Sequence, residues 1–257
     1  MGTFLFDKIV FGPVYSRRLG HSLGLNLLPT GEKICTFDCV YCECGWTKSN
    51  TAKFVDVDVF KEALENKLQK MLENNEIADT ITYAGNGEPT LHPYFDEIID
   101  VSINLRDKYM PNTDIAVLSN STTLSNDKVF NSLFKIEKRI MKLDVGSNEM
   151  FDKINQCNSN IMLEDIVNNL ARFNGDLIIQ TLLLKGKIGN IYFDSSTEKE
   201  LTLLREHLAK INPHTLMLYS IYRGTPMETL EAISNEELEK VKNYLALYLP
   251  NCKILVY

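Results

Sequence analysis

The chain has 257 residues, of which 44% are hydrophobic and 24% charged, and its formal net charge is −7. This length allows one large α/β domain with a full core, and the absence of about 18 consecutive apolar residues excludes a transmembrane span. The acidic balance argues against a broad nucleic-acid surface, because contacts to phosphate need Lys and Arg.

The charge is unevenly distributed along the chain. The first 53 residues carry six basic and four acidic side chains, whereas the remainder is strongly acidic. Residues 9–21 contain the turn signal Gly12-Pro13 and are expected to be irregular or hairpin-like. Within them, Arg17 and Arg18 are candidates for gripping an anionic substrate, because guanidinium binds carboxylate and phosphate bidentately. An ordinary surface pair of arginines is an equally good interpretation.

A cysteine-rich loop follows the first predicted strand, Ser22–Leu28. The stretch K-I-C-T-F-D-C-V-Y-C-E-C-G-W places Cys35, Cys39 and Cys42 in a C-x3-C-x2-C spacing, with Cys44 close behind. Three thiolates on one short loop can wrap one corner of an iron–sulfur cube. A [4Fe–4S] cluster normally takes four thiolates, so that one iron would stay open for a small molecule.

The cysteines have three other interpretations: a disulfide, a structural zinc site and unligated thiols. A start without a basic region followed by an apolar one predicts a reducing cytoplasm, where disulfides are rare. Structural zinc usually takes two ligand pairs separated by a longer loop, unlike this single run. Unligated thiols remain the third alternative. Cys157 and Cys252 lie far from the loop and are expected to be ordinary small thiols.

A glycine-rich segment ends the next predicted strand. Residues 56–75 have one apolar helical stripe, and the short strand 80–84 runs into Gly85-Asn86-Gly87-Glu88-Pro89. The two glycines permit close approach of the backbone to a ligand, and Glu88 can accept a hydrogen bond from an ammonium group. His92 is expected to be a loop or capping histidine.

Strands and helices then continue to alternate. Polar residues follow several strands, among them Asn120, Asp144 and Arg223, and Gln180 interrupts an otherwise apolar strand. Ser234 to Glu237 fits an S-x-x-E capping box. Six strand–helix units predict parallel strands with right-handed crossovers, with ligand groups at their carboxyl ends, and fewer than eight units predict an open barrel. The expected helices are 94–109, 126–135, 163–173, 196–211 and 234–247, and the expected strands are 114–118, 139–143, 176–184, 215–221 and a small seventh at 253–256.

The cysteine spacing, with Tyr41 directly before the last cysteine, resembles the radical S-adenosylmethionine (SAM) superfamily. The G-N-G-E-P stretch is similar to its glycine-glycine-glutamate segment, with Asn86 as a departure. Three further segments resemble a stand-alone subfamily related to the tRNA wyosine-forming, 4-demethylwyosine synthase-like enzymes. They are S-R-R-L-G-H-S-L-G-L-N-L, K-L-D-V-G-S-N-E-M-F-D-K-I-N and Y-R-G-T-P. The resemblance covers about residues 9–245. It implies an α/β fold, a partial (βα)6 TIM-like barrel, as a single domain over 1–257 with an N-terminal extension (1–21), a βα core (22–245) and a C-terminal tail (246–257).

The resemblance also implies a mechanism and cofactors. A reduced [4Fe–4S] cluster would cleave SAM to methionine and a 5′-deoxyadenosyl radical, which abstracts hydrogen from a substrate. Backbone near Tyr41 would contact adenine, and Gln180 could either touch SAM in the barrel lumen or satisfy a core backbone group. The implied cluster ligands are Cys35, Cys39 and Cys42, and the implied SAM-binding residues are Tyr41, Gly85, Gly87, Glu88, Asn120, Asp144 and Gln180.

The substrate stays open at this point: an RNA base (with tRNA as one candidate), a small metabolite or a peptide. Candidates on the substrate side are Arg17, Arg18, Arg223 and Cys44, the last either a hydrogen-atom donor, a thiol near the cluster or packing. The expected partner is a reductant such as flavodoxin or ferredoxin, and the expected enzyme is cytoplasmic and anaerobic. The alternative function is a non-catalytic iron–sulfur or zinc protein acting in electron transfer or partner binding.

Overall fold

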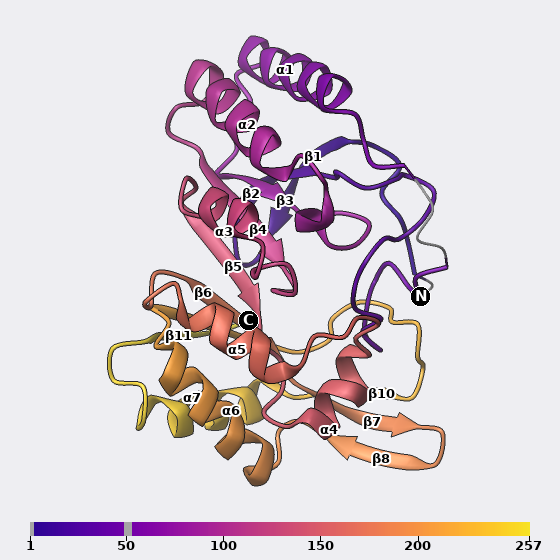
Figure 1. Ribbon diagram of the computed structural model, residues 1–257, viewed down its shortest axis with the longest axis vertical. Coiled ribbons are helices and arrows are strands. Elements are labelled where there is room, and N and C mark those ends of the chain that lie inside the picture. The colour runs from indigo at the N-terminus through magenta and orange to yellow at the C-terminus, as the bar shows by residue number, and fades with distance from the viewer. Residues whose placement is uncertain (1–2, 49–52) are drawn as a thin grey trace.

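The computed structural model describes residues 3–48 and 53–257 and is built around one curved, eight-stranded sheet (Figure 1). Every neighbouring pair of strands is parallel except the first two, which form an antiparallel hairpin. The sheet curves without closing, which confirms the predicted partial barrel. In spatial order its strands are β1 (Val10–Ser16), β2 (Gly20–Leu25), β3 (Thr80–Tyr83), β4 (Asp114–Ser119), β5 (Lys138–Lys142), β6 (Ile178–Leu182), β9 (Thr215–Tyr219) and β11 (Lys253–Val256).

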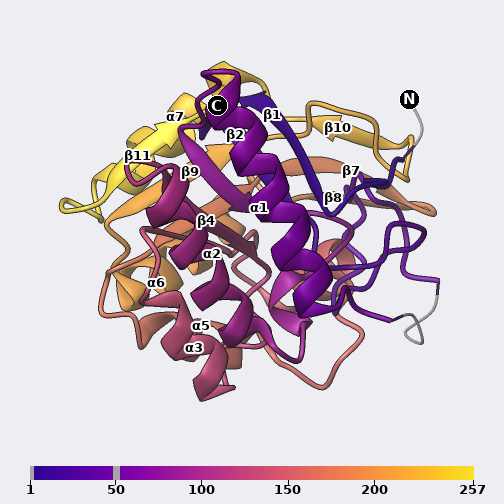
Figure 2. The same cartoon turned by 90° about the horizontal axis from the view of Figure 1, so that it is seen from above.

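Helices cover the outer face of this sheet (Figures 1 and 2). Their ends follow the expected signals. Asp56 caps α1 (Val57–Glu73) by accepting from the Asp58 N–H at 2.9 Å. Ser234 with Glu237 forms the predicted capping box of α7 (Asn235–Ala246). None of the helices in the described residues is long and apolar enough to cross a membrane. The helices are α1 (Val57–Glu73), α2 (Phe95–Tyr109), α3 (Asp127–Leu133), α4 (Asn148–Met150), α5 (Leu163–Ala171), α6 (Glu198–Ile211), α7 (Asn235–Ala246), the 3-10 turn η1 (Pro89–Leu91) and the π turn η2 (Phe151–Asn155).

The hydrophobic core has two parts because alternate residues of a strand face opposite sides of the sheet. The larger part joins the outer strand faces to the helices. The smaller part lies on the inner face, where Leu19 of the β1–β2 turn packs against residues of four strands. Those four residues are Ala116 (β4), Ile140 (β5), Ile178 (β6) and Met217 (β9).

The structure departs from the predicted elements in two places. The apolar run predicted as one strand over 176–184 breaks after Leu182, and a separate three-stranded sheet follows, in the order β10-β7-β8. A continuous apolar run has no period that could mark this break. Residues 148–155, for which no element was expected, form α4 and η2. The added strands are β7 (Leu184–Ile188), β8 (Ile191–Asp194) and β10 (Leu230–Ala232).

Both edges of the main sheet come from the ends of the chain. β1 lies within the predicted extension 1–21, and β11 lies within the predicted tail 246–257 and pairs with β9 as a parallel strand. The predicted seventh strand is therefore present. The carboxyl ends of β2, β3, β4, β5, β6 and β9 share one rim of the sheet, and the cysteine loop leaves β2 at this rim, where active sites of parallel α/β proteins lie.

Candidate active site

The cysteine loop, residues 33–48, is fastened to the rim at two points. At its start, Ile34 pairs with Gly87: the Ile34 N–H donates to the Asn86 carbonyl at 2.9 Å, and the Glu88 N–H donates to the Ile34 carbonyl at 3.0 Å. In its middle, the Val40 N–H donates to the Ile154 carbonyl of η2 at 3.0 Å. These bonds bring the cysteines beside the predicted SAM-binding segments.

A buried lysine ties the two ends of the loop together. The Lys33 side chain is 1% exposed, and its ammonium donates to Asp38 Oδ1 at 3.0 Å and to the Gly45 carbonyl at 2.9 Å. Burial alone would lower the pKa of Lys33, but the nearby Cys42, Cys35 and Asp38 outweigh it and raise that pKa above its usual value. Lys33 is therefore a fixed positive charge next to the thiols.

The cysteines are all free thiols, and amide groups point at two of them. Cys35 Sγ accepts from the Phe37 N–H at 3.4 Å and from Asn120 Nδ2 at 3.5 Å. Cys39 Sγ accepts from Asn155 Nδ2 at 3.6 Å. Within residues 3–48 and 53–257, no three His, Cys, Asp or Glu side chains gather around one point to hold a single metal ion. Soft thiols with N–H donors and a buried cation beside them suit an anionic iron–sulfur cluster.

The thiols differ in their surroundings. Burial raises the pKa of Cys39 to about 11, although the Lys142 charge opposes this. A hydrogen bond from the Cys44 thiol lowers the pKa of Cys42 to about 6 in spite of burial, and Lys33 acts in the same direction. Cys44 also lies within hydrogen-bonding distance of the Gly85 carbonyl, at 3.4 Å. Cys44 thus lies between a predicted cluster ligand and the G-N-G-E segment.

The G-N-G-E segment needs its glycines because other parts of the chain lie directly against both of them. Gly87 has φ +134°, and a Cβ there would overlap the Ile34 carbonyl. A Cβ on Gly85 would overlap the Asn26 side chain. Asn86 is fully buried and exchanges hydrogen bonds with the backbone of Phe6, donating at 2.9 Å and accepting at 2.8 Å. The departure from glycine at position 86 therefore anchors the N-terminal segment.

Replacing Gly87 with alanine is expected to destabilise the fold by about 2 kcal/mol or more, because the methyl group meets backbone rather than a movable side chain. Chemical unfolding of the cluster-free protein measures this change. Gly31→Ala is the matched control, since a Cβ at Gly31 meets nothing within 4 Å. Equal free energies of unfolding for the two variants would contradict the prediction.

Glu88 and Asn120 face the first cysteine from the ends of β3 and β4. Glu88 is buried, its Oε2 accepts from the Asn120 N–H at 2.6 Å, and its Oε1 accepts from the Thr90 N–H at 3.1 Å. Burial raises the pKa of Glu88, although these hydrogen bonds oppose the rise. Asn120 Nδ2 donates to Thr36 at 2.8 Å as well as to Cys35. Two predicted SAM residues are thus joined to each other and to a predicted ligand.

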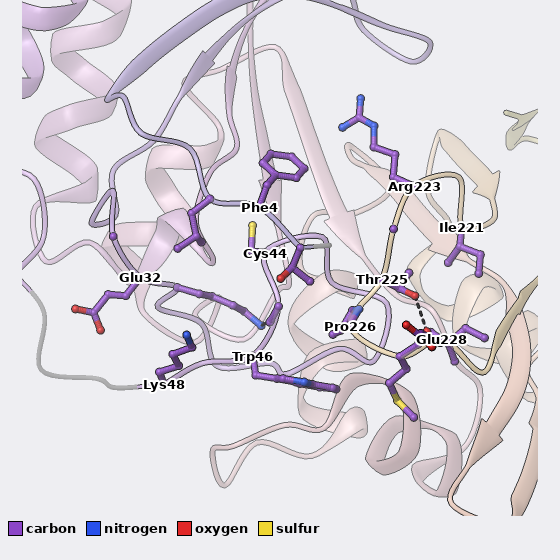
Figure 3. A pocket seen from close by; sticks show the side chains of 18 residues that line it. Phe4, Glu32, Cys44, Trp46, Lys48, Ile221, Arg223, Thr225, Pro226 and Glu228 are labelled. Carbon is purple, nitrogen blue, oxygen red and sulfur yellow. Dashed lines mark hydrogen bonds between the residues drawn. The ribbon is translucent and has the colours of Figure 1, made fainter. Parts of the chain in front are cut away.

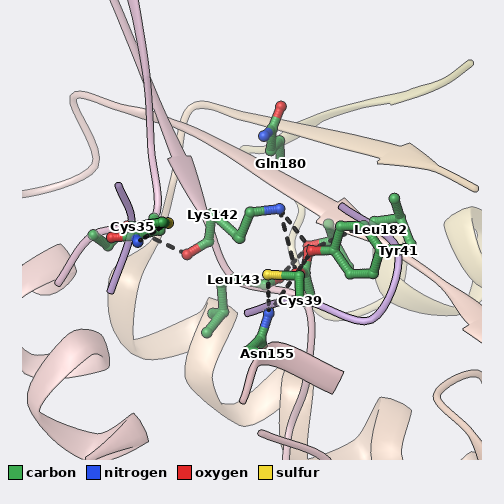
Figure 4. Close-up of polar contacts among 12 residues, drawn as sticks. Cys35, Cys39, Tyr41, Lys142, Leu143, Asn155, Gln180 and Leu182 are labelled. Atoms are coloured by element: carbon green, nitrogen blue, oxygen red, sulfur yellow. Dashed lines mark hydrogen bonds and ion pairs between the residues drawn. The ribbon is translucent and has the colours of Figure 1, made fainter. Parts of the chain in front are cut away.

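Asp144 is the centre of a buried network, and its side chain is 0% exposed. Figure 4 labels its partners Tyr41, Lys142 and Asn155. Its Oδ1 accepts from the Leu182 N–H at 2.9 Å, and its Oδ2 accepts from the Tyr41 hydroxyl and from Asn155 Nδ2, the latter at 2.9 Å. Lys142 Nζ lies 3.4 Å from the same carboxylate and donates to the Tyr41 hydroxyl at 2.7 Å. Both carboxylate oxygens are therefore engaged by the protein itself.

The sequence motifs do not identify the side chains of Lys142 and Asn155 as parts of the site. Both lie at the ends of the K-L-D-V-G-S-N-E-M-F-D-K-I-N segment, so the motif contained them, but no signal pointed to their side chains. Asn155 links Asp144 to the Cys39 sulfur through its two contacts. The Asp144 charge raises the pKa of Lys142 above its usual value even though burial opposes this.

The predicted arginines occupy three different places. Arg18 Nη1 donates to Gln180 Oε1 at 2.8 Å, and Gln180 is buried on the inner face of β6. Arg17 is exposed, with its guanidinium 4.4 Å from the centre of the Tyr222 ring. Arg223 pairs with Glu43 of the cysteine loop at 3.0 Å and is 60% exposed. Arg18 reaches into the barrel, whereas Arg223 lies outside it.

A cavity of about 1040 Å³ opens beside the cysteine loop (Figure 3). Its walls are the N-terminal segment 3–5, the cysteine loop and the loop that follows β9. Cys44 and Trp46 line it on the cysteine-loop side, and Arg223 and Glu228 line it on the side of the other loop. This cavity connects solvent with the neighbourhood of the thiols.

Comparison with known proteins gives matches over most of the chain. The family model described as the radical SAM superfamily matches residues 33–182. The chain is 32% identical to a protein of Brachyspira hyodysenteriae named GTPase Obg, over 97% of this chain but only 35% of that protein's length. It is 32% identical to a UPF0026 protein of Methanocaldococcus jannaschii, over 93% of this chain and 71% of that protein.

Solved structures share the fold at low sequence identity. A radical SAM methyltransferase from Sphaerobacter thermophilus superposes with a TM-score of 0.69 at 13% identity, over 92% of this chain and 65% of that one. An archaeal TYW1 superposes with a TM-score of 0.53 at 15% identity, over 88% of this chain and 72% of that one.

Proposed function

The chain belongs to the radical SAM superfamily and is an enzyme, and from this premise we propose that Cys35, Cys39 and Cys42 hold a [4Fe–4S] cluster with one iron open to SAM. When bound, the cluster and SAM supply a one-electron cleavage to methionine and a 5′-deoxyadenosyl radical, which takes hydrogen from the substrate. The observation that carries the proposal is three free thiols on one loop at the strand rim, with amide donors and a buried cation beside them.

The groups around the thiols stabilise negative charge on sulfur. Asn120 and Asn155 direct amide N–H groups at Cys35 and Cys39. Lys33 adds a positive charge that is shielded from solvent. N–H donors and cations near thiolates favour the more negative, reduced state of a cluster. These side chains therefore make electron uptake easier.

The SAM side of the proposal uses residues at the ends of β3, β4 and β5. Backbone at Gly85 and Gly87, with the Glu88 carboxylate, is proposed to hold the methionyl amine, and Asn120 to approach the ribose or carboxylate. The backbone near Tyr41 is proposed to contact the adenine of SAM, and Gln180 is proposed to contact SAM inside the barrel lumen. The Asp144 side chain is 0% exposed, so a direct contact with the ribose would require neighbouring side chains to move, and its proposed role is to position Tyr41 and Asn155.

The enzyme requires a one-electron reductant, and we propose flavodoxin or ferredoxin in the cytoplasm. An RNA base, including one in tRNA, a small metabolite and a peptide are all proposed as substrate classes. Cys44 and Arg223 lie at the cavity of Figure 3 and are proposed on the substrate side. The chain spans only part of the length of its relatives, so activities of those whole proteins are not transferred to it.

The test is anaerobic. The protein is reconstituted with iron and sulfide, reduced and mixed with SAM, and 5′-deoxyadenosine is measured by chromatography. Its formation, even slow and without substrate, is the expected result. If the protein has a brown cluster whose absorbance spectrum does not change with SAM, and no 5′-deoxyadenosine forms, the protein is instead an electron carrier. If the protein is colourless and contains zinc, the cysteines form a structural metal site.

A further inference from the structure

The inner face of the sheet is arranged in two layers. The lower layer is apolar and contains Ala116, Ile140, Ile178 and Met217, closed by Leu19. Two residues further along each strand, on the same face, the side chains become mostly polar. This upper layer contains Leu118, Lys142, Gln180 and Tyr219.

Arg18 completes the upper layer from the opposite edge of the sheet. It lies in the turn between β1 and β2, next to Leu19, yet it donates to Gln180 of β6 at 2.8 Å. Its guanidinium carbon also lies 4.5 Å from the centre of the Tyr219 ring on β9. The β1–β2 turn therefore crosses the open side of the barrel, and Arg18 reaches its interior.

The charge of Arg18 has no acidic partner in the part of the chain that the structure describes. Its guanidinium donates one hydrogen bond to a protein side chain there, although it carries five N–H groups. Arg17, next to it, likewise pairs with no carboxylate among residues 3–48 and 53–257. Lys142 adds a further cation to the layer, and its partner is Asp144. A half-buried cation with unused donors is costly unless an anion completes it.

We infer that Arg18, Gln180 and Tyr219 form a binding site for an oxyanion, the carboxylate or phosphate group of the substrate. Arg18 supplies a planar pair of donors, and Tyr219 holds the guanidinium plane from one face. Lys142 of the same layer touches Tyr41 of the cysteine loop, so the site lies directly beneath the proposed chemistry. The inference rests on the proposed function: the anion anchors the substrate, whose C–H groups then extend toward the loop.

The test measures binding of two simple probes, inorganic phosphate and acetate, to the reconstituted enzyme without SAM or reductant. Titrations of the thermal midpoint are made at constant ionic strength. At least one probe is expected to saturate in the wild-type protein, and Arg18→Gln is expected to weaken that binding by about tenfold or more, because the charged, bidentate donor is lost. The probe that saturates identifies the anion as phosphate or carboxylate.

Two further variants keep the result interpretable. Arg205→Gln is the matched control, because Arg205 also lies over a tyrosine ring, 4.2 Å from that of Tyr248, but outside the barrel. Arg18→Lys keeps the charge without the planar fork and should bind with intermediate affinity, even if Arg18→Gln fails to fold. No saturation in the wild type, or equal loss in Arg205→Gln, would overturn the site. Because no SAM is present, failure to cleave SAM would leave this result unaffected.

Discussion

Cys39→Ala is expected to lack the cluster and to form no 5′-deoxyadenosine. Cys39 is buried at the centre of the loop, and its sulfur already accepts a hydrogen bond from Asn155. Alanine leaves only two of the three proposed thiolate ligands of the cluster. Iron and sulfide analysis, with absorbance near 400 nm, measures the loss.

Cys252→Ala is the matched control for this experiment. Cys252 is also a free thiol, but it lies beside β11 at the other end of the chain. The control should contain as much iron as the wild type. Circular dichroism of both variants should match the wild type, because each change removes only one sulfur atom, although both cysteines contact the hydrophobic core. A full, SAM-responsive cluster in Cys39→Ala would remove Cys39 from the ligand set.

The second large effect is expected for Asp144→Asn, which should destabilise the protein by about 3–5 kcal/mol, as for a buried ion pair that loses one partner. The change leaves Lys142 charged, mostly buried and without its carboxylate, and it weakens the hydrogen bonds from Tyr41 and Asn155. Denaturant unfolding of the cluster-free protein measures the difference. In Asp152→Asn the same chemical change falls on an exposed residue and should cost less than about 0.5 kcal/mol.

The pH dependence of this variant gives an independent check. In the wild type the folded-state pKa of Lys142 is raised, so the stability from its ion pair is present below the usual lysine pKa and is lost as pH rises through the folded value. In Asp144→Asn the largest remaining cause is burial, which lowers the pKa of Lys142. The unfolded state then binds more protons, and stability should rise as pH approaches the usual lysine value. A variant whose stability falls over the same pH range would contradict the assignment.

Much of the fold could be predicted because its signals are local. The apolar stripes of α1 and α6, the Ser234 capping box and the short β-type runs each lie within one element, so helix and strand positions agree closely with those expected. The alternation of predicted strands and helices along the chain then implied a parallel sheet. The β10-β7-β8 sheet could not be predicted in this way, because Leu230 pairs with Gly186 through a contact between distant segments that no local period records.

The same limit applies to the site. The spacing of Cys35, Cys39 and Cys42 carries its meaning within eight residues, and it indicated the family directly. The contacts of Asp144 cannot be predicted from a short stretch of sequence in this way. Tyr41 lies 103 residues before Asp144, and only the fold brings the two side chains together. From the sequence Arg18 was a candidate for binding an anion, with an ordinary surface arginine as an equal alternative, but its contact with Gln180, 162 residues away, depends on the curvature of the whole sheet.

The buried Lys33 has a consequence for how this enzyme matures. Its ammonium joins Asp38 and Gly45, so contacts within the polypeptide, in addition to any metal–thiolate bonds, hold the ends of the cysteine loop together. Small metal-dependent domains differ, because their chains fold only when the ion binds. Loss of the cluster to oxygen is therefore expected to leave the loop closed and the protein ready to be loaded again.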